Sequence, residues 1–304
     1  MPEDIGTIIN KGINTWVRNL NIFIPFFLNS IVEGIISIFF FGLMAILLFA
    51  SQIESGMDLE ALSPEELLSM FGSAFLDNIG IAVVSLFLYY LLISFIQVFF
   101  RAGAIGMAKE ANEKGDTVFS DMIRYGSKNT FRLFLTTVLI GLLVLIGIVF
   151  IVPGALAVDD LSFFLENPKS SFEAMGLLGI GLIIWVLYAL LINLLLSVVP
   201  FALVLDELDP IEAVSTGLSF FMDNKLSAFF LWGISISMSM ALGLAQHYLG
   251  ANLYLSFLIS LISLVVILPL TTVWWTRFYL DRTGKKLYDH FELLDDPDEF
   301  VKSY

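Results

Sequence analysis

The sequence predicts an all-α fold: a polytopic membrane protein with six transmembrane helices that form three hairpins. Its 304 residues are 58% hydrophobic and only 14% charged, which lies outside the range of soluble globular proteins. Six apolar stretches also recur along the chain, each longer than the roughly 18 residues that a helix needs to cross a bilayer. A soluble protein would need far more polar helix to bury six such segments.

The six predicted spans cover residues 22–51, 79–105, 131–153, 174–205, 226–246 and 252–275. They are too long, and too rich in Leu, Ile, Ala and Met, for the alternating strands of an outer-membrane barrel. Residues 1–21 lack the basic start and short apolar core of a signal peptide, so we expect no cleaved signal. The lack of cysteine excludes disulfides and thiolate metal sites.

The distribution of Lys and Arg predicts the orientation. With the N-terminus inside, all of the 15 basic residues except Lys169 fall on the cytoplasmic side. Because cytoplasmic loops of membrane proteins are enriched in Lys and Arg, we expect both termini inside and a location in a prokaryotic cytoplasmic membrane. The net charge of −14 argues against nucleic acid as a partner.

A cytoplasmic amphipathic helix is predicted before each hairpin. Residues 4–21 place isoleucines and Trp16 on one face and polar residues on the other, which is typical of a helix lying in the membrane interface. Trp16 would anchor this helix. Residues 119–132 and 210–225 occupy the equivalent places before the third and fifth spans.

An internal repeat is also predicted. The pattern Gly-x-x-x-aromatic-x-x-Asn occurs at residues 12–19 and again at 217–224. Repeats with this arrangement share one orientation in the membrane, so they are parallel and not inverted. We therefore predict one six-span domain, residues 1–285, with repeat-like units 1–113, 114–208 and 209–285, followed by an acidic cytoplasmic tail, 286–304.

Glu33 is the most unusual residue, because it lies in the apolar run FFLNSIVEGIISIFFF at residues 26–41. It is about 11 residues into its span and therefore roughly 16 Å deep, near the bilayer centre. A carboxylate exposed to lipid there costs roughly 2.5–3.5 kcal/mol, so Glu33 should face protein. Asn29 and Ser37, one turn on either side, extend the same polar stripe.

The same depth count places two amides from other spans near this layer. Gln97 and Asn193 are about 8 and 12 residues from the cytoplasmic ends of their spans, or roughly 12 and 18 Å deep. Arg101, one turn beyond Gln97, can reach inward or extend out to the cytoplasm, and we favour the outward direction. The candidate ligand- or ion-binding residues are thus Glu33, Asn29, Ser37, Gln97, Arg101 and Asn193.

Two interpretations of Glu33 remain open. In one, it binds a cation, a proton or a polar headgroup in an intramembrane pocket, since ionisable groups within a membrane often mark functional sites. In the other, it is a hydrogen-bonded acid that fixes helix packing through Gln97 or Asn193. Because no second carboxylate lies nearby in the sequence, the packing interpretation stays open beside the functional one.

Motifs that carry catalytic chemistry are absent from the sequence. The two histidines, His247 and His290, are isolated and lack metal-ligand spacing, and no Gly-rich phosphate loop follows a strand. We therefore expect no catalytic residue, no metal site and no cofactor. Aromatic side chains at the cytoplasmic exit of the last span are predicted as interfacial anchors: Trp274, Trp275 and Tyr279.

Two segments resemble a known group of proteins. FSDMIRYGSKN at residues 119–129 and DELDPIEAVSTGLSFFMDNK at 206–225 look like parts of six-span prokaryotic, largely archaeal membrane proteins of uncharacterised function. These are related to the membrane domain attached to some glycerophosphodiester phosphodiesterases. The resemblance implies the six-span layout, but the soluble phosphodiesterase barrel has no counterpart here. It therefore implies neither that activity nor any catalytic residue.

Three functions fit these observations. We favour a non-enzymatic membrane protein that binds or moves a small polar or lipidic ligand in a pocket near Glu33. A structural or accessory scaffold, acting through lipid or a partner membrane protein, is the second. A lipid-modifying enzyme is the third and the least supported. The bilayer is the expected partner, while a bound lipid and a homo-oligomer remain open.

Overall fold

The computed structural model describes residues 2–54, 63, 72, 78–158 and 172–288. This part of the chain is almost wholly helical and contains no strand. Within it, the six predicted spans are confirmed as helices long and apolar enough to cross a membrane. They cover Leu20–Leu47, Ile79–Lys114, Phe119–Phe150, Ala174–Asp206, Lys225–Leu249 and Leu253–Arg282. Residues 289–304, most of the predicted acidic tail, lie outside the described part.

The described part of the chain forms fourteen helical elements, not all of which belong to the six spans. In chain order they are α1 (Ile5–Arg18), η1 (Leu20–Phe23), α2 (Ile24–Glu54), α4 (Ile79–Lys114), α5 (Phe119–Ile146), η3 (Gly147–Phe150), α6 (Val152–Leu156), α8 (Phe172–Leu195), α9 (Val199–Asp206), α10 (Pro210–Asp223), α11 (Lys225–Leu249), α12 (Leu253–Ile262), η5 (Ser263–Ile267) and α13 (Leu268–Arg282).

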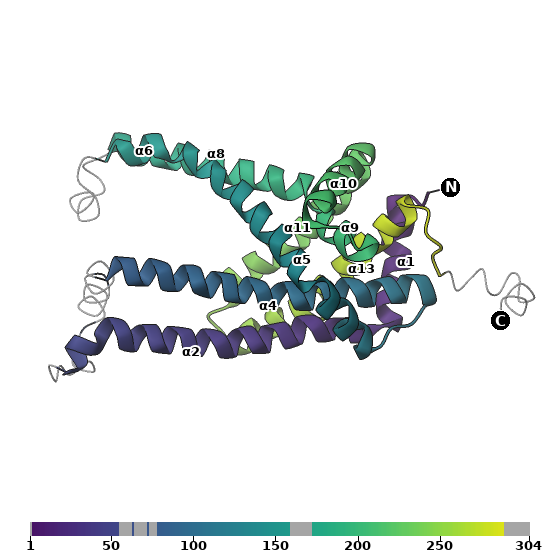
Figure 1. The fold of residues 1–304 in the computed structure, drawn as a ribbon, viewed down its shortest axis with the longest axis horizontal. Coiled ribbons are helices and arrows are strands. Elements are labelled where there is room, and N and C mark those ends of the chain that lie inside the picture. The colour runs from purple at the N-terminus through teal and green to yellow at the C-terminus, as the bar shows by residue number, and fades with distance from the viewer. Residues whose placement is uncertain (1, 55–62, 64–71, 73–77, 159–171, 289–304) are drawn as a thin grey trace, which may run out of the picture.

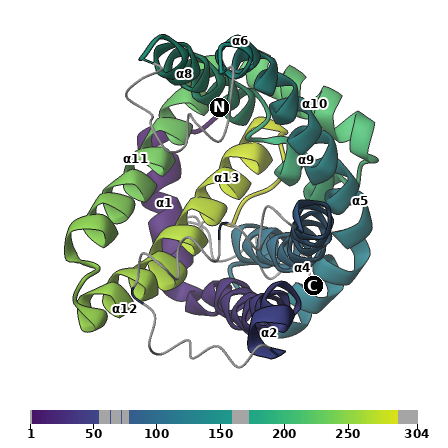
Figure 2. The ribbon, with the colours of Figure 1, turned by 90° about the vertical axis from the view of Figure 1, so that its left-hand side faces the viewer.

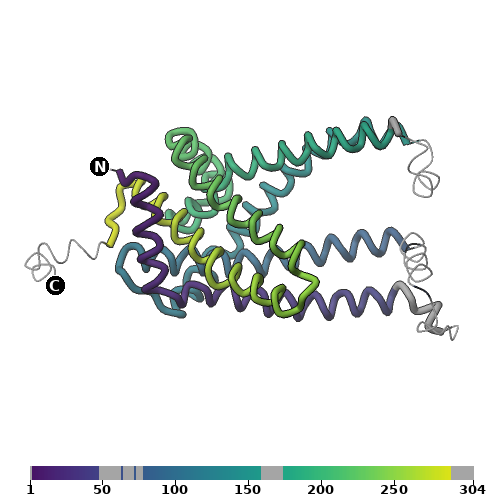
Figure 3. Tube along the Cα trace, turned by 180° about the vertical axis from the view of Figure 1, so that it is seen from behind, coloured from purple at the N-terminus to yellow at the C-terminus, as the bar shows by residue number. Residues whose placement is uncertain are grey.

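The helices surround α13. Figure 1 shows α2 and α4 side by side along the long axis, while α5 crosses obliquely towards α8, which diverges from them. In the end-on view of Figure 2, α2, α4, α5, α8 and α11 form a ring around α13. Seen from behind in Figure 3, α1 lies across the same end of the molecule as the last turns of α13.

The most extensive helix packing is between α4 and α5. Small residues allow it: Gly103 lies against Met122, and Gly106 lies against the ring of Tyr125. Close approach through glycines is a common way for membrane helices to associate. This contact joins the second and third spans, so it crosses the predicted boundary between the first two repeat-like units.

The second predicted interfacial helix, residues 119–132, is corrected by the structure. These residues are the first part of α5, which continues without a break to Ile146. By contrast, α1 and α10 both stop at an asparagine, Asn19 and Asn224, with φ of −122° in each case. Each asparagine amide donates to the carbonyl four residues earlier. This shared ending agrees with the repeat, which stays a prediction.

The N-terminal segment is tied to α13. Gly12 of α1 lies against the indole of Trp274, whose Nε1 donates to the carbonyl of Ile9 at 3.1 Å. Arg277, only 1% exposed, donates to both carboxylate oxygens of Glu3 at 2.7 and 2.8 Å. A buried charge is stable only when it is paired and hydrogen-bonded, so this ion pair anchors the start of the chain.

The predicted aromatic anchors of the last span also need correction. Trp274, Trp275 and Tyr279 are 3%, 6% and 1% exposed and belong to the protein core. Side chains so deeply buried cannot reach a lipid interface, because α1 and α9 pack against this part of α13 and Phe220 of α10 lies against the ring of Tyr279. Trp16 is half-buried and packs partly against the core, with its Nε1 unpaired.

Acid is expected to weaken the attachment of the N-terminal segment. Burial alone would raise the pKa of Glu3, but hydrogen bonds and charge from Arg277 and Lys11 outweigh it and lower this pKa below 4.5. A lowered folded-state pKa means that the stabilisation is complete above about pH 4.5 and is lost as the pH falls through the folded value. Thermal unfolding in detergent between pH 7 and 3 should therefore show a fall in Tm below about pH 4.5, and the fall should be smaller in Glu3→Gln.

Candidate functional site

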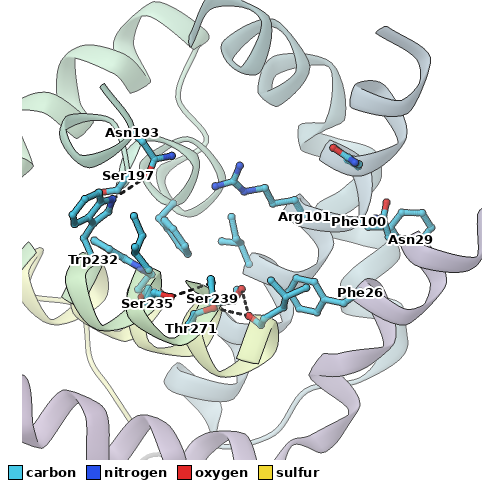
Figure 4. Close-up of a pocket in the computed structure, with 17 residues that line it drawn as sticks. Phe26, Asn29, Phe100, Arg101, Asn193, Ser197, Trp232, Ser235, Ser239 and Thr271 are labelled. Atoms are coloured by element: carbon cyan, nitrogen blue, oxygen red, sulfur yellow. Dashed lines mark hydrogen bonds between the residues drawn. The ribbon is translucent and has the colours of Figure 1, made fainter. Parts of the chain in front are cut away.

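A polar cavity of about 390 Å³ lies between the spans. Its walls come from α2, α4, α8, α9, α11 and α13, together with Ser197 between α8 and α9. Because five of the six spans contribute, the cavity exists only in the assembled bundle. Figure 4 shows polar side chains on several of its walls. They include Arg101, Asn193, Ser235, Ser239, Thr271 and Thr272.

Four of the six predicted site residues line this cavity: Asn29, Gln97, Arg101 and Asn193. Glu33 and Ser37 do not line it. They lie on the next turns of α2, beyond Asn29 in the direction away from the N-terminus. The predicted polar layer is therefore divided into a carboxylate group beside the cavity and a set of donors within it.

The partners of Glu33 are amides. Gln97 Nε2 lies 3.2 Å from each carboxylate oxygen, and Asn29 Nδ2 lies 3.3 Å from one of them. Ser37 donates to the backbone carbonyl of Glu33 at 2.6 Å and is 2.6 Å from the hydroxyl of Tyr89. Glu33 is half-buried and forms no ion pair with Arg101. It thus joins α2 to α4 and holds Gln97 in place.

Arg101 extends into the cavity, which corrects the favoured outward direction. Figure 4 shows its guanidinium directed towards the side of the cavity that carries Asn193 and Ser197. The structure shows no hydrogen bond or ion pair from this guanidinium to any described residue. A guanidinium carries five N–H donors and a permanent positive charge, so Arg101 has its full capacity for binding an acceptor.

Asn193 faces Arg101 from α8 and is held by α11. Trp232 Nε1 donates to its side-chain oxygen at 3.0 Å, as drawn in Figure 4. Because this bond engages the side-chain oxygen, it fixes the orientation of the amide and leaves the Nδ2 group to donate to another acceptor. No described residue accepts a hydrogen bond from that Nδ2. The cavity therefore has unpaired donors on two opposite walls.

The hydroxyl groups of the cavity are paired with their own helices. Ser235, Ser239 and Thr272 each donate to the carbonyl four residues earlier, at 2.8, 3.0 and 2.8 Å. Such hydroxyls can rotate to donate to a ligand, since a hydroxyl hydrogen turns about its C–O bond. Thr271 and Thr272 follow the π-helical turn η5, a feature often found at functional sites in helices.

Some residues of this site were not anticipated from the sequence pattern. Trp232, Thr271 and Thr272 line the cavity although none was a candidate. A signal for Trp232 exists, because it shares one face of α11 with Ser235 and Ser239 at spacings of three and four. Among the described residues, no group of three His, Asp or Glu side chains is placed to hold a metal ion.

The comparisons with known proteins give one distant relative. An uncharacterised protein of Archaeoglobus fulgidus is 25% identical over 295 residues, covering 93% of this chain and 97% of the relative. No protein-family model matches the chain, and no solved structure matches it. The resemblance to the membrane domain of glycerophosphodiester phosphodiesterases is therefore not shown, whereas the likeness to an uncharacterised archaeal protein is.

Proposed function

We propose that this chain is a multi-pass membrane protein whose cavity binds a ligand carrying a negatively charged, hydrogen-bond-accepting group. The observation that supports the proposal is Arg101, a permanent cation that reaches into the cavity and has no partner among the residues that the structure describes. Intramembrane charges are expensive and usually pair with one another or mark a ligand pathway. A ligand anion would supply the missing partner.

The geometry of the donors supports an anion over a cation. Arg101 and the Nδ2 of Asn193 present N–H groups from opposite sides, and the carboxylate of Glu33 is outside the cavity. Guanidinium groups bind carboxylate and phosphate oxygens with two parallel hydrogen bonds. Glu33 has an indirect role in this proposal: it positions Gln97, one turn from Arg101 on α4, and does not itself bind the ligand.

The orientation with both termini in the cytoplasm is part of the proposal. It is supported by the distribution of Lys and Arg and by ion pairs that gather where α4, α5, α9 and α13 end or begin, near the termini. These pairs include Lys114–Glu110, Lys128–Glu207 and Lys285–Asp206. The helices α1 and α10 would then lie at the cytoplasmic interface. Kinship with the phosphodiesterase membrane domain, suggested by residues 119–129 and 206–225, adds no catalytic residue.

The experiment uses a single cysteine in a chain that has none. Ser239→Cys places a thiol of nearly the same size in the cavity wall. Its reaction rates with anionic 2-sulfonatoethyl and cationic 2-(trimethylammonio)ethyl methanethiosulfonate are then compared in purified protein. We expect the anionic reagent to react faster. At an effective dielectric constant of about 20, a unit charge about 10 Å from a thiol changes the rate of a charged reagent on the order of tenfold.

Arg101→Gln should remove this preference and lower the ratio of anionic to cationic rates at least tenfold, by the same rough Coulomb estimate. Arg101→Lys keeps the charge and should keep most of the ratio. The ratio also cancels any change in thiol ionisation. Leu187→Cys, on the exposed face of α8, serves as a control that should react slowly with both reagents. If the thiol at position 239 reacts with neither, the cavity is closed to water and the scaffold function gains support.

A further inference from the structure

A second, apolar cavity of about 480 Å³ adjoins the polar one. It is lined by Val144 of α5 and by Trp185, Val186, Ala189 and Leu190 of α8. We call it the apolar slot. Asn193 and Ile236 line both the slot and the polar cavity, so the two spaces meet at these residues. The slot therefore adjoins the polar cavity at Asn193, one of the hydrogen-bond donors of that cavity.

The slot runs along α8 away from Asn193. The rise of 1.5 Å per residue puts Trp185 about 12 Å from Asn193 along the helix. The Nε1 of Trp185 donates to the carbonyl of Val144 at 3.0 Å, which fixes its indole against α5 at the far end. The exposed side chains of Val186 and Leu190, 44% and 40% accessible, place the slot at the outer surface of the bundle. That surface faces lipid if α8 spans the bilayer.

The two helices beside this opening are loosely joined. Contacts between α8 and α11 are sparse compared with those between α4 and α5. The hydrogen bond from Trp232 to Asn193 links them at the point where the slot meets the polar cavity. The slot and the polar cavity together thus lead from the surface of the bundle towards Arg101, past the hydrogen bond between Trp232 and Asn193.

We infer that the ligand of the polar cavity is an anionic lipid, whose headgroup binds Arg101 while a hydrocarbon chain lies in the apolar slot. The inference rests on the proposed function and names the ligand class. A soluble anion would use only the polar cavity and would leave the adjoining slot without a role. A lipid would keep its chain in apolar surroundings as its headgroup reaches Arg101, so entry would not require the chain to be placed in a polar space.

The test measures how two probes protect the Ser239→Cys thiol from the neutral reagent N-ethylmaleimide, in purified full-length protein in dodecyl maltoside. The probes are inorganic phosphate and dodecyl phosphate. Both should slow the reaction, and both effects should be lost in Arg101→Gln. The neutral reagent is chosen because dodecyl phosphate makes micelles negatively charged.

The deciding variant is Ala189→Phe, which fills the slot with a ring. We expect it to raise the half-protecting concentration of dodecyl phosphate about tenfold and to leave that of phosphate unchanged. The control is Ile183→Phe, which also introduces a phenyl ring but at a 60% exposed position of α8 outside both cavities. It should change neither half-protecting concentration. Because dodecyl phosphate partitions into micelles equally in both samples, comparing the two variants removes the effect of that partitioning.

The outcomes separate the two proposals. If neither probe protects, or if protection survives Arg101→Gln, the proposed function is wrong. If phosphate protects but Ala189→Phe and Ile183→Phe give the same dodecyl phosphate value, the lipid inference is wrong and the anion site stands. Should Ala189→Phe lose its monodisperse elution or its thermal transition, Ala189→Leu replaces it and is expected to produce a smaller shift of the same kind.

Discussion

Glu3→Ala is expected to destabilise the protein by about 3–5 kcal/mol, the usual cost of leaving one member of a buried ion pair without its partner. Glu3 accepts two hydrogen bonds from Arg277, whose side chain is 1% exposed. It also pairs with Lys11 at 3.0 Å. Without Glu3, the guanidinium would remain in the core beside Trp274 and Tyr279 with its charge uncompensated.

A double variant separates the ion pair from other effects of the substitution. Thermal and denaturant unfolding of Glu3→Ala, Arg277→Met and the combined variant should show a combined loss well below the sum of the single losses. Replacing a buried ion pair by apolar groups is often nearly neutral, whereas breaking it is not. Arg18→Gln, at an exposed position of α1, should shift stability by less than about 0.5 kcal/mol. If the loss of stability in the combined variant equalled the sum of the two single losses, the ion pair between Glu3 and Arg277 would be contradicted.

Gly106→Ala is expected to cost about 3 kcal/mol, at the upper end of overpacking effects. A Cβ at this position would lie 2.1 Å from Cγ of Tyr125, far inside van der Waals contact. The ring has little freedom to move away, because its hydroxyl donates to Glu110 at 2.8 Å. The helices α4 and α5 would have to separate along their closest contact.

The control for Gly106→Ala is the same substitution at Gly179 of α8. An added Cβ at Gly179 meets no atom within 4 Å, so the substitution changes only the conformational preference of the backbone. Alanine is favoured over glycine within a helix by roughly 0.5–1 kcal/mol, so Gly179→Ala should be neutral or slightly stabilising. Unfolding curves that show equal effects for the two substitutions would overturn the packing argument for Gly106.

The six spans and the contact between Glu33 and Gln97 could be predicted from the sequence, and for the same reason. A helix that crosses a bilayer has a constant rise, so the position of a residue along its span measures its depth. Depth counting placed Glu33 and Gln97 in neighbouring layers, and the structure joins them at 3.2 Å. The sequence does not show which way a side chain faces around its helix axis when nearly every face of the helix is apolar.

The incorrect predictions arose where the outcome depended on which way a side chain faces and on what packs against it. Arg101 lies near the end of the predicted span, 79–105, but α4 continues to Lys114, so Arg101 sits well inside the helix and lines the cavity. Trp274, Trp275 and Tyr279 have the composition of an interfacial belt, yet residues of α1, α9 and α10 cover them. The continuation of α5 through residues 119–132 likewise depends on its packing against α4.

The sequence by itself determined that the chain is helical and where its six long apolar segments lie. Length, hydropathy and helical rise are local properties, and each can be evaluated one segment at a time. Only the tertiary structure decided which polar groups share a space, because the cavity is formed by five spans at once. It separated Glu33, which accepts hydrogen bonds from amides, from Arg101, whose N–H groups meet no acceptor in the described part of the chain. That separation depends on contacts between residues far apart in the chain.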